Sequence, residues 1–395
     1  MKKIIAYLFV FLLTMIFANA VSAEKISVGL YYGESSPSEV AINCDGQDLT
    51  VNREDISEEG LVFSSSDIIK VNNISYNGDI IIKKDASGNI TVINEVEMED
   101  YVSSVIAKEM SPSFEKEALK AQAVCARTYA IASVGRHSMF DVCATVHCQV
   151  YAGASCADGK TADAAEQTKG EILTYNGQPA QTVYFAASGG YTESAKFIWG
   201  SDTPYLTAVS DEFEDADCYL HKWTKEISPS QITNILSSKG YNIGEVKDIK
   251  IIEQTPNGVV HKLSVIGDLG EELFKNEWCR ILFGGLLPSQ AYNISRDGAA
   301  TLKTYYGTVS LSDISILSAD GYTRGAADTL YIKGGSNSTA VTPGLSGNFV
   351  FTGRGNGHLV GMSQNGANGM ARAGFSYDEI LTHYYSGTEI IRIED

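Results

Sequence analysis

The spacing of apolar residues predicts a pair of helices joined by a Ser-Pro-Ser turn, in the stretch that begins MEDYVSSVIAKEM. In the first helix Val102, Val105 and Ile106 recur at intervals of three and four, which is the period of one helical face. Glu109 falls on the same face, and it is followed by Met110 and then by the Ser-Pro-Ser turn. The second helix is rich in alanine, and its expected N-cap is Ser113. The pattern thus puts one carboxylate in line with an apolar stripe at a helix end.

Apolar periodicity predicts β structure on both sides of the helical pair. Residues 24–94 are expected to be rich in strands, and two of these, 79–84 and 90–93, flank an Asp-Ala-Ser-Gly-Asn turn. The chain returns to strands from Ile172 onward. The serine-, threonine- and glycine-rich residues 300–348 are expected to form further short strands.

Residues 222–300 mix the helical and the strand period. Residues 228–239 and 271–283 are expected to be helical, whereas 246–253 and 259–266 are expected to be strands around a Pro-Asn-Gly turn. The last block of the chain is expected to be a glycine-rich loop followed by two short helices.

These elements predict an α+β fold, with the helical pair packed on antiparallel β-sheets and a mixed α/β insertion or second domain. A length of 395 residues allows two to three domains. The expected parts are a signal peptide or membrane anchor at 1–23, a β-rich region at 24–94, a first part of the catalytic core at 95–221, the mixed insertion at 222–348, and a second part of the core at 349–395.

The N-terminus combines two lysines with a long apolar run. Lys2 and Lys3 precede the apolar residues 4–18, and small residues follow. This order is typical of a secretory signal, with cleavage after Ala20 or Ala23. The run is also about long enough to span a bilayer, so an uncleaved anchor stays open. In both cases the rest of the chain is expected to be extracytoplasmic, either membrane-anchored or secreted.

The formal net charge of -18 restricts the class of partner. Proteins that bind nucleic acid carry basic surfaces, so no nucleic-acid partner is expected. Electrostatic docking to anionic lipid is disfavoured for the same reason. A glycan partner remains open.

Glu109 is the candidate for acid–base chemistry. A carboxylate among apolar neighbours has its charged form disfavoured, which raises its pKa as a general acid requires. Spacing alone nevertheless favours an ordinary role, either as a solvated helix-end residue or as the ion-pair partner of Arg127, because structural carboxylates outnumber perturbed ones.

A cluster of cysteines and histidines predicts a metal site. His137, Cys143, His147 and Cys148 supply two imidazoles and two thiolates, a full tetrahedral set for zinc. Four protein ligands close the coordination shell, so the site would be structural. Two alternatives stay open: Cys156 replaces one ligand, or a Cys143–Cys148 or Cys148–Cys156 disulfide forms instead.

Two glycine-rich loops carry polar side chains. Ser188 begins a Ser-Gly-Gly-Tyr-Thr segment whose glycines permit close approach of a ligand, and it is not part of a G-x-S-x-G nucleophile motif. The GRGNGH loop lacks the Gly-Lys-Ser/Thr ending of a phosphate-binding loop, which argues against nucleotide binding. His358, Ser363 and Gln364 offer groups suited to sugar hydroxyls, although a buried, hydrogen-bonded His358 is an equal alternative.

Three separated stretches together carry a family resemblance. MEDYVSSVIAKEM–PSF–EALKAQAVCARTYA, SGGYTES and GRGNGHLVGMSQNGA resemble, in this order, the stage II sporulation protein D family (SpoIID, related to LytB). The similarity covers residues 90–394, including TPNGVV–LSVIG and the RILFG segment. Asn356, Leu359 and Asn365 depart from the pattern, at positions that usually carry aromatic or glycine residues, and indicate a different local loop shape.

The resemblance implies a peptidoglycan lytic transglycosylase, which cuts between N-acetylmuramic acid and N-acetylglucosamine and leaves a 1,6-anhydro end. The family's catalytic glutamate falls on Glu109, and some members carry zinc near the 137–148 stretch. The implied setting is engulfment during sporulation at the mother-cell membrane, with peptidoglycan glycan strands as substrate and the SpoIIP amidase and SpoIIM membrane protein as partners. The residues expected to position the sugars are Gln122, Arg127, Tyr129, Ser188, Tyr191, Thr192, His358, Ser363 and Gln364.

Three other functions remain as alternatives. The chain could be a non-catalytic, peptidoglycan-binding activator of an amidase. A hydrolytic muramidase would need a second carboxylate near Glu109. A zinc hydrolase would need an open ligand position on the metal. A lytic transglycosylase needs only one acid/base group, because the muramyl C6 hydroxyl is the nucleophile, and this agrees with a single glutamate on an apolar face.

Overall fold

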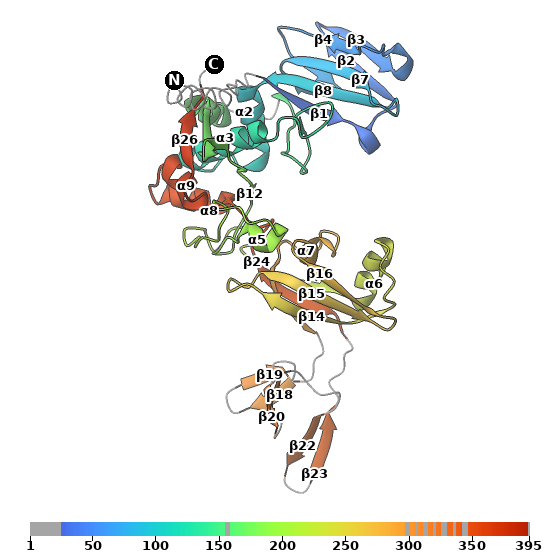
Figure 1. The fold of residues 1–395 in the computed structure, drawn as a ribbon, viewed down its shortest axis with the longest axis vertical. Coiled ribbons are helices and arrows are strands. Elements are labelled where there is room, and N and C mark those ends of the chain that lie inside the picture. The colour runs from blue at the N-terminus through green and yellow to red at the C-terminus, as the bar shows by residue number, and fades with distance from the viewer. Residues whose placement is uncertain are drawn as a thin grey trace, which may run out of the picture. The chain divides into compact units, whose positions relative to one another are not determined.

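A computed structural model describes residues 25–154, 159–296 and 347–393, and the backbone of short strands between 301 and 341 (Figure 1). The described residues form two compact units. The second unit is Tyr184–Gly366, and the first contains the described residues before and after it. The expected signal or anchor at 1–23 and Cys156 lie outside the described residues. Within the described part of the chain, no helix has the length and apolarity needed to cross a membrane.

The first unit contains a five-stranded sheet whose central strand is β8. The strands in spatial order are β4 (Leu61–Phe63), β7 (Asp79–Lys84), β8 (Ile90–Glu97), β1 (Lys25–Tyr31) and β9 (Val142–Cys143). Neighbours are antiparallel except for β1 and β9, which run parallel. β8 is buried along most of its length, and its buried residues include the polar Thr91 and Asn94.

This unit also contains a second, four-stranded sheet. Its order is β3 (Gln47–Asn52), β2 (Glu39–Cys44), β5 (Ile69–Val71) and β6 (Ile74–Tyr76). Short 3-10 turns at Gly33–Ser35 and Arg53–Asp55 connect its strands to their neighbours.

The predicted helical pair follows β8 directly. α2 (Met98–Glu109) and α3 (Lys116–Ala132) pack against each other and against α4 (Gly159–Gln167) (Figure 1). Val105 and Ile106 of α2 are fully buried, as the helical period predicts. α3 begins later than expected: its N-cap is Glu115, whose backbone N–H donates to Asn368 Oδ1 at 2.8 Å, and not Ser113.

The C-terminal residues return to this first unit. β26 (Glu389–Arg392) pairs with β10 (Glu171–Tyr175), which also pairs with β11 (Gln178–Pro179). α9 (Tyr377–Tyr384) packs against α3, and α8 (Gln364–Arg372) precedes it, so the two predicted terminal helices are present.

The second unit consists of two three-stranded antiparallel sheets with short helices. The first sheet contains β13 (Lys222–Ile227), β24 (Phe349–Arg354) and β17 (Ala291–Arg296); the second contains β14 (Val246–Gln254), β15 (Val260–Gly267) and β16 (Glu271–Lys275). The other elements are the parallel pair β12 (Tyr184–Phe185) and β25 (Met362–Ser363), and the helices α5 (Ala195–Trp199), α6 (Pro229–Ser238) and α7 (Trp278–Ile281). Their apolar side chains share one core around Phe351, Phe283 and Leu263.

One expected helix of this unit is wrong in its first half. Residues 271–283 were expected to be helical, but Glu271–Lys275 form β16, which pairs with β15 and buries Phe274. Only Trp278–Ile281 are helical. This short stretch forms a strand because β15 offers it an open edge to pair with. Such a tertiary contact cannot be deduced from the local sequence.

The structure confirms the α+β class. Helices α2 and α3 pack beside antiparallel sheets, and the mixed region forms a separate β-rich unit. The described strands between 301 and 341 pair antiparallel as β18 with β19 (Thr301–Thr304, Gly307–Ser310), β20 with β21 (Ser315–Ser318, Gly321–Arg324) and β22 with β23 (Leu330–Gly334, Asn337–Val341). The boundaries expected after 94, 221 and 348 fall inside the two units.

Candidate functional site

Glu109 is the last residue of α2. Met110 leaves the helix in an extended conformation, with φ -124° and ψ 150°, so the chain turns away beside the carboxylate. The side chain of Glu109 is half-buried, and Oε1 accepts a hydrogen bond from the Val150 backbone N–H at 3.2 Å. The carboxylate is therefore oriented by a backbone amide while part of the residue remains open to solvent.

Arg127 does not present its charge at the protein surface. Its side chain is fully buried and forms a two-point ion pair with Glu99, in which Nε donates to Oε1 at 2.9 Å and Nη2 contacts Oε2. The carbonyls of Glu171 and Ala165 accept further bonds at 3.0 and 3.1 Å. A buried arginine needs such partners. These contacts give Arg127 a structural role with Glu99, in place of the alternative pairing with Glu109.

The other sugar-positioning candidates of the first unit differ in exposure. Gln122 is fully buried in α3. Tyr129 is half-buried, and its hydroxyl accepts a hydrogen bond from Arg136 at 2.8 Å. Of these two side chains, Tyr129 is the one that a ligand could reach without rearrangement.

The four predicted zinc ligands come together in the 137–148 loop. His137 Nε2 lies 3.4 Å from Cys148 Sγ, and His147 Nδ1 lies 3.5 Å from Cys148 Sγ and 3.7 Å from Cys143 Sγ. All four donor atoms lie within 4.8 Å of one another. Bonds of about 2.0–2.3 Å to a tetrahedral zinc place its ligands roughly 3.3–3.8 Å apart, so the residues present fit this metal.

The loop is fixed to β1 on one side. β9 adds to β1 in parallel, and Asp141 Oδ2 accepts hydrogen bonds from the Ser27 N–H and hydroxyl at 3.1 and 2.6 Å. The ring of Phe140 stacks on His137 with centroids 4.5 Å apart. A Cβ on Gly29 would come within 2.5 Å of the Phe140 ring, so the loop needs a glycine there.

The ionisation of the cluster suits a metal. Burial opposes ionisation of Cys143, but hydrogen bonds from Thr145 and Tyr32 outweigh it and lower the pKa of the thiol to about 6. Burial, and then the neighbouring His147, lower the pKa of His137, which keeps this imidazole neutral. Zinc binds thiolates and neutral imidazoles. Cys143 and Cys148 are free thiols here, so they do not form the alternative disulfide with each other.

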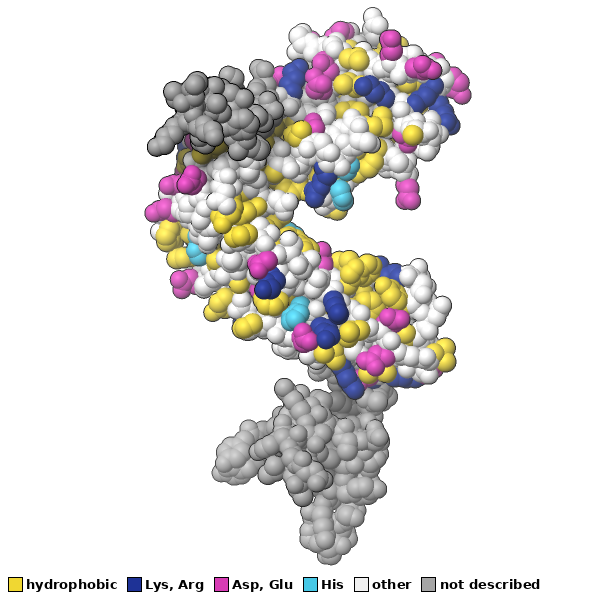
Figure 2. Space-filling view, in the orientation of Figure 1, with side chains coloured by type: hydrophobic (Ala, Val, Ile, Leu, Met, Phe, Trp, Pro, Cys, Tyr) yellow, Lys and Arg dark blue, Asp and Glu magenta, His cyan; other side chains and the backbone are white. Residues whose placement is uncertain are grey.

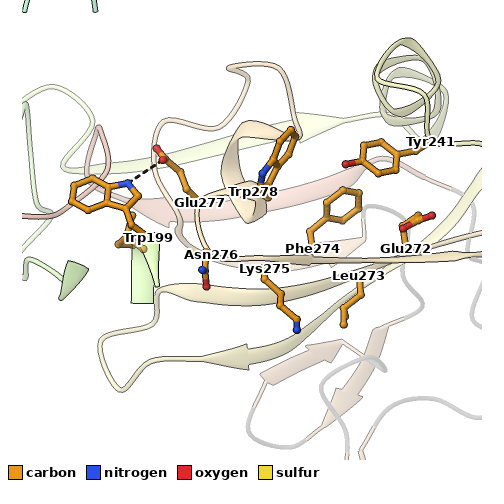
Figure 3. A pocket seen from close by; sticks show the side chains of 10 residues that line it. Trp199, Tyr241, Glu272, Leu273, Phe274, Lys275, Asn276, Glu277 and Trp278 are labelled. Atoms are coloured by element: carbon orange, nitrogen blue, oxygen red, sulfur yellow. Dashed lines mark hydrogen bonds between the residues drawn. The ribbon is translucent and has the colours of Figure 1, made fainter. Parts of the chain in front are cut away.

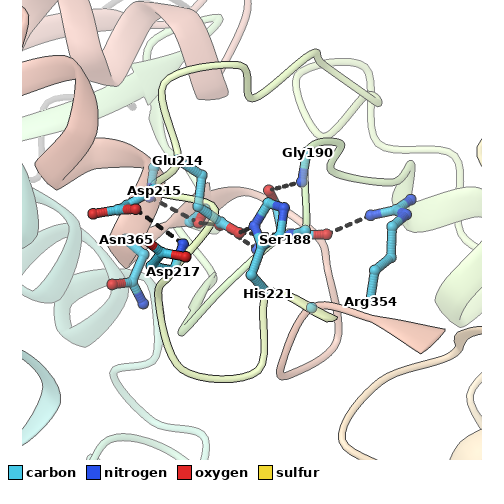
Figure 4. A network of polar contacts seen from close by, with 12 residues as sticks. Ser188, Gly190, Glu214, Asp215, Asp217, His221, Arg354 and Asn365 are labelled. Atoms are coloured by element: carbon cyan, nitrogen blue, oxygen red, sulfur yellow. Dashed lines mark hydrogen bonds and ion pairs between the residues drawn. The ribbon is translucent and has the colours of Figure 1, made fainter. Parts of the chain in front are cut away.

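In the second unit, Glu214 organises the Ser-Gly-Gly loop (Figure 4). Its buried carboxylate accepts hydrogen bonds from the backbone N–H groups of Ser188 at 2.5 Å and Gly189 at 2.7 Å. It also contacts His221 Nδ1 and accepts from the Ser363 hydroxyl, both at 2.8 Å. One carboxylate thus ties the SGGYTES motif to the GMSQNG motif, which begins more than 160 positions later.

Glu214, Cys218 and His221 also form a second group of metal-type donors, with all three donor atoms within 4.8 Å. The carboxylate of Glu214 is already occupied by four donors. Burial, and then the charge of Glu214, raise the pKa of Cys218 to about 12, so this thiol stays protonated at neutral pH. Glu214 therefore acts as a hydrogen-bond acceptor that holds the surrounding loops together. The sequence analysis did not identify Glu214, because it lies in an acidic stretch where nothing distinguishes it from its neighbours.

Arg354 closes the same loop from the other side (Figure 4). Its Nη1 contacts the Ser188 carbonyl and donates to the Tyr191 carbonyl at 2.8 Å, and Nη2 donates to the Asn257 carbonyl at 2.8 Å. Gly189 has φ +69°, and a Cβ there would lie 2.6 Å from Arg354 Cβ, so this position requires glycine.

His358 lies between two aromatic rings of this unit. Its centroid is 5.5 Å from that of Phe185 and 5.2 Å from that of Trp199. Nδ1 accepts a hydrogen bond from the Val360 N–H at 3.1 Å. Burial of the ring lowers the pKa of His358 to about 4, so the ring is neutral. This supports the alternative of a packed, hydrogen-bonded histidine.

The remaining predicted residues of this unit are mostly inside the protein. Ser188, Thr192 and Ser363 are fully buried and Gln364 nearly so, whereas Tyr191 is 48% exposed. Burial favours a role for the first four in holding the loops and leaves Tyr191 accessible to a ligand.

The sequence departure at Leu359 coincides with an unusual backbone. Leu359 has φ +67°, in the left-handed region that glycine usually occupies, and its carbonyl accepts the Glu193 N–H at 2.6 Å. The loop therefore keeps a glycine-like shape with a buried leucine.

Charges are mixed on the surface that Figure 2 shows. Lys and Arg side chains lie among Asp and Glu on both described units and do not gather into one basic patch on this face.

Comparisons with known proteins agree on one family. Residues 86–175 match a family model described as stage II sporulation protein. The stage II sporulation protein D of Bacillus subtilis is 30% identical over 315 residues, which cover 75% of each chain. The amidase enhancer of the same species is 32% identical over 73% of this chain, which spans only 40% of that relative. An uncharacterised protein of Brachyspira hyodysenteriae is 29% identical over 87% of this chain and 79% of its own.

Proposed function

Because the chain belongs to the stage II sporulation protein D family, we propose that it is a peptidoglycan lytic transglycosylase with Glu109 as its single catalytic acid and base. The observation that supports this most directly is the position of Glu109. It ends a helix with a buried apolar face, its carboxylate is oriented by the Val150 amide, and it remains partly accessible. The family is a sporulation family, and cleavage of the glycan between N-acetylmuramic acid and N-acetylglucosamine is the finer step proposed here.

The proposed reaction uses Glu109 twice. The protonated carboxyl gives its proton to the glycosidic oxygen as the bond to the anomeric carbon of the muramyl residue breaks. The carboxylate then takes the proton of the muramyl C6 hydroxyl as this oxygen bonds to the anomeric carbon. One C–O bond breaks and one forms, no water is consumed, and the product is a 1,6-anhydro end. The Val150 N–H orients the carboxylate through Oε1.

A structural zinc ion is part of the proposal. His137, Cys143, His147 and Cys148 would hold it, and the metal would lock the loop as a cross-link without taking part in the reaction. Val150, which orients Glu109, follows this loop by two residues. The zinc ligands would therefore act on the catalytic residue through the backbone.

The proposed setting follows from the family and the N-terminal sequence. The chain would act outside the cytoplasm on peptidoglycan glycan strands during sporulation, held by its N-terminal segment or released after cleavage. Its proposed partners are the SpoIIP amidase and the SpoIIM membrane protein.

The test is a Glu109→Gln variant incubated with purified glycan strands. Glutamine keeps the shape and the contact with Val150 but cannot exchange a proton, so we expect anhydromuramyl products to fall by at least about 100-fold. Mass spectrometry distinguishes them from hydrolysis products, which are heavier by one water. Glu115→Gln is the matched control, since Glu115 is exposed, lies six positions on and makes no side-chain cap. Unchanged product formation by Glu109→Gln would refute the assignment.

The relative named amidase enhancer supports a second candidate function. In that case the chain would bind peptidoglycan and stimulate an amidase without cutting glycan itself. Anhydro ends formed by the purified chain in the absence of any amidase would exclude this alternative.

A further inference from the structure

A cavity in the second unit lies apart from the Ser-Gly-Gly loop and is lined by aromatic and charged side chains (Figure 3). Its walls come from the end of α5, from β16 and from the start of α7, together with Tyr241. The volume is about 540 Å³, which falls within the usual range for small-ligand sites. None of the predicted site residues lines it.

Two of the three tryptophans of the chain open into this cavity. Trp199 is 37% exposed and Trp278 is 44% exposed. The third, Trp223, is buried and donates its indole N–H to the Gly355 carbonyl at 2.9 Å. An exposed indole leaves a large apolar face in water, and two in one concave site indicate a surface that is covered by a ligand.

Each indole has a charged partner: a carboxylate at the ring N–H of Trp199 and an ammonium over the ring face of Trp278. Trp199 Nε1 donates to Glu277 Oε2 at 3.0 Å, while Glu277 Oε1 accepts from Arg280 at 2.8 Å. Lys239 Nζ lies 5.8 Å from the centre of the Trp278 ring. Side chains fixed before binding lose little freedom when a ligand arrives. In Figure 3 the Trp199, Glu277 and Trp278 side chains follow one another along the site.

The polar groups of the cavity select for a neutral ligand with many hydroxyls. Glu272 and Asn276 are partly exposed in its wall, and Lys275 supplies a charge of opposite sign. A negatively charged group inside the cavity would meet the carboxylates of Glu272 and Glu277, and a purely apolar group would leave them without water or partners, so the part of the strand that enters is expected to be uncharged. A pyranose ring fits both features, because its axial C–H groups form an apolar face for an indole and its hydroxyls bond to carboxylate and amide groups.

We propose that this cavity is an accessory saccharide subsite that binds an N-acetylhexosamine unit of the glycan strand on Trp278 and Trp199. The inference rests on the proposed function, because it takes the glycan strand as the ligand. The acetamido group supplies a donor and an acceptor that match Glu272 and Asn276. Trp199 also contacts His358, so the subsite adjoins the glycine-rich block that carries the family motif.

The test uses the full chain with Glu109→Gln, which removes cleavage without altering the cavity. Affinity for peptide-free glycan strands is measured by isothermal titration calorimetry, alone and with a second substitution. We expect Trp278→Ala to weaken binding by about tenfold and Trp278→Phe by less, since phenylalanine retains a smaller ring face. Tyr219→Ala is the control, because Tyr219 is 79% exposed in the same unit and does not line the cavity.

A second measurement needs no variant in the cavity. Chitotetraose, a neutral oligomer of N-acetylglucosamine, is titrated while tryptophan fluorescence is recorded. Because Trp223 is buried, a saturable change in emission reports Trp199 and Trp278. We expect such a change in the Glu109→Gln chain and in the Tyr219→Ala control.

The outcomes separate the subsite from the proposed function. Equal affinities of the Trp278→Ala and Tyr219→Ala chains, or no fluorescence response to chitotetraose, would overturn the subsite while glycan cleavage by the unaltered chain stands. A chain that neither cuts nor binds glycan strands would overturn both.

Discussion

At the scale of single residues, the donor atoms of the 137–148 loop decide whether a metal is present. Three of the separations between donor atoms are 3.4–3.7 Å and all lie within 4.8 Å, which fits a tetrahedral site. We expect the purified chain to contain about one zinc after dialysis, and Cys143→Ser with Cys148→Ser to contain almost none, because a hydroxyl is a much poorer zinc ligand than a thiolate. Elemental analysis by mass spectrometry measures this content.

Cys44→Ser is the control for the zinc measurement. Cys44 is a free cysteine outside the cluster, with its Sγ 3.9 Å from the Ser64 carbonyl, so its replacement should leave the zinc content unchanged. Zinc retained by the double serine variant, or absent from a chain refolded with the metal, would contradict the site.

Residue types in sequence could predict the donors and the acid but not their partners. The four zinc-type donors lie within twelve positions, so short-range pattern was sufficient to predict that they come together, whereas the pattern placed Glu109 only at a helix end and the family resemblance made it the proposed acid. Glu99, which pairs with Arg127 across 28 positions, and Glu214, which holds a loop 26 positions away, carry no such local signal. Burial and long-range contact select one carboxylate among many.

At the scale of elements, Glu214 connects loops that the sequence separates. In Glu214→Gln, an amide NH2 takes the place of one carboxylate oxygen. This group is a donor and faces other donors, so buried backbone N–H groups lose their acceptor. We expect a loss of about 3 kcal/mol, which lowers the thermal midpoint of the second unit by about 6 °C or more. Calorimetry on the full chain measures this midpoint.

Glu212→Gln is the matched control for this substitution. Glu212 is exposed and lies two positions from Glu214, so the same change of charge should leave the midpoint within about 1 °C. If both variants have the same thermal midpoint as the unaltered chain, Glu214 does not hold the loop.

The type of an element could be predicted where its hydrophobic pattern extends over many residues, and the prediction failed where the pattern is short. The α2 pattern extends over twelve residues and the β14–β15 hairpin brackets a Pro-Asn-Gly turn, and both are present. β16 has five residues, EELFK, in which Leu273 is exposed and Phe274 buried. This alternation is too short to separate a strand from a helix until β15 supplies its partner.

At the scale of the whole molecule, the chain leaves the first unit at Val183 and returns to it at Ala367. The return is fixed by β26 pairing with β10, a contact between residues more than 200 positions apart. An insertion between two parts of the core was expected from the sequence, but a hydrophobic pattern contains no information on which strand pairs with which, so the pairing of β26 with β10 could not be predicted.

The net charge of -18 is a property of the whole molecule, and it predicts how salt changes the affinity for glycan strands. Glycan strands of peptidoglycan carry carboxylates, so a chain of the same sign is repelled at low ionic strength, and added salt screens this repulsion. For the Glu109→Gln chain we expect affinity for glycan strands to rise between 0.05 and 0.5 M NaCl, while affinity for neutral chitotetraose stays within twofold. A protein that used basic residues to hold its polymer would show the opposite trend, since salt weakens such contacts. Glycan affinity that falls steeply with salt would therefore place the strand on a cationic surface and contradict binding through aromatic faces and hydrogen bonds.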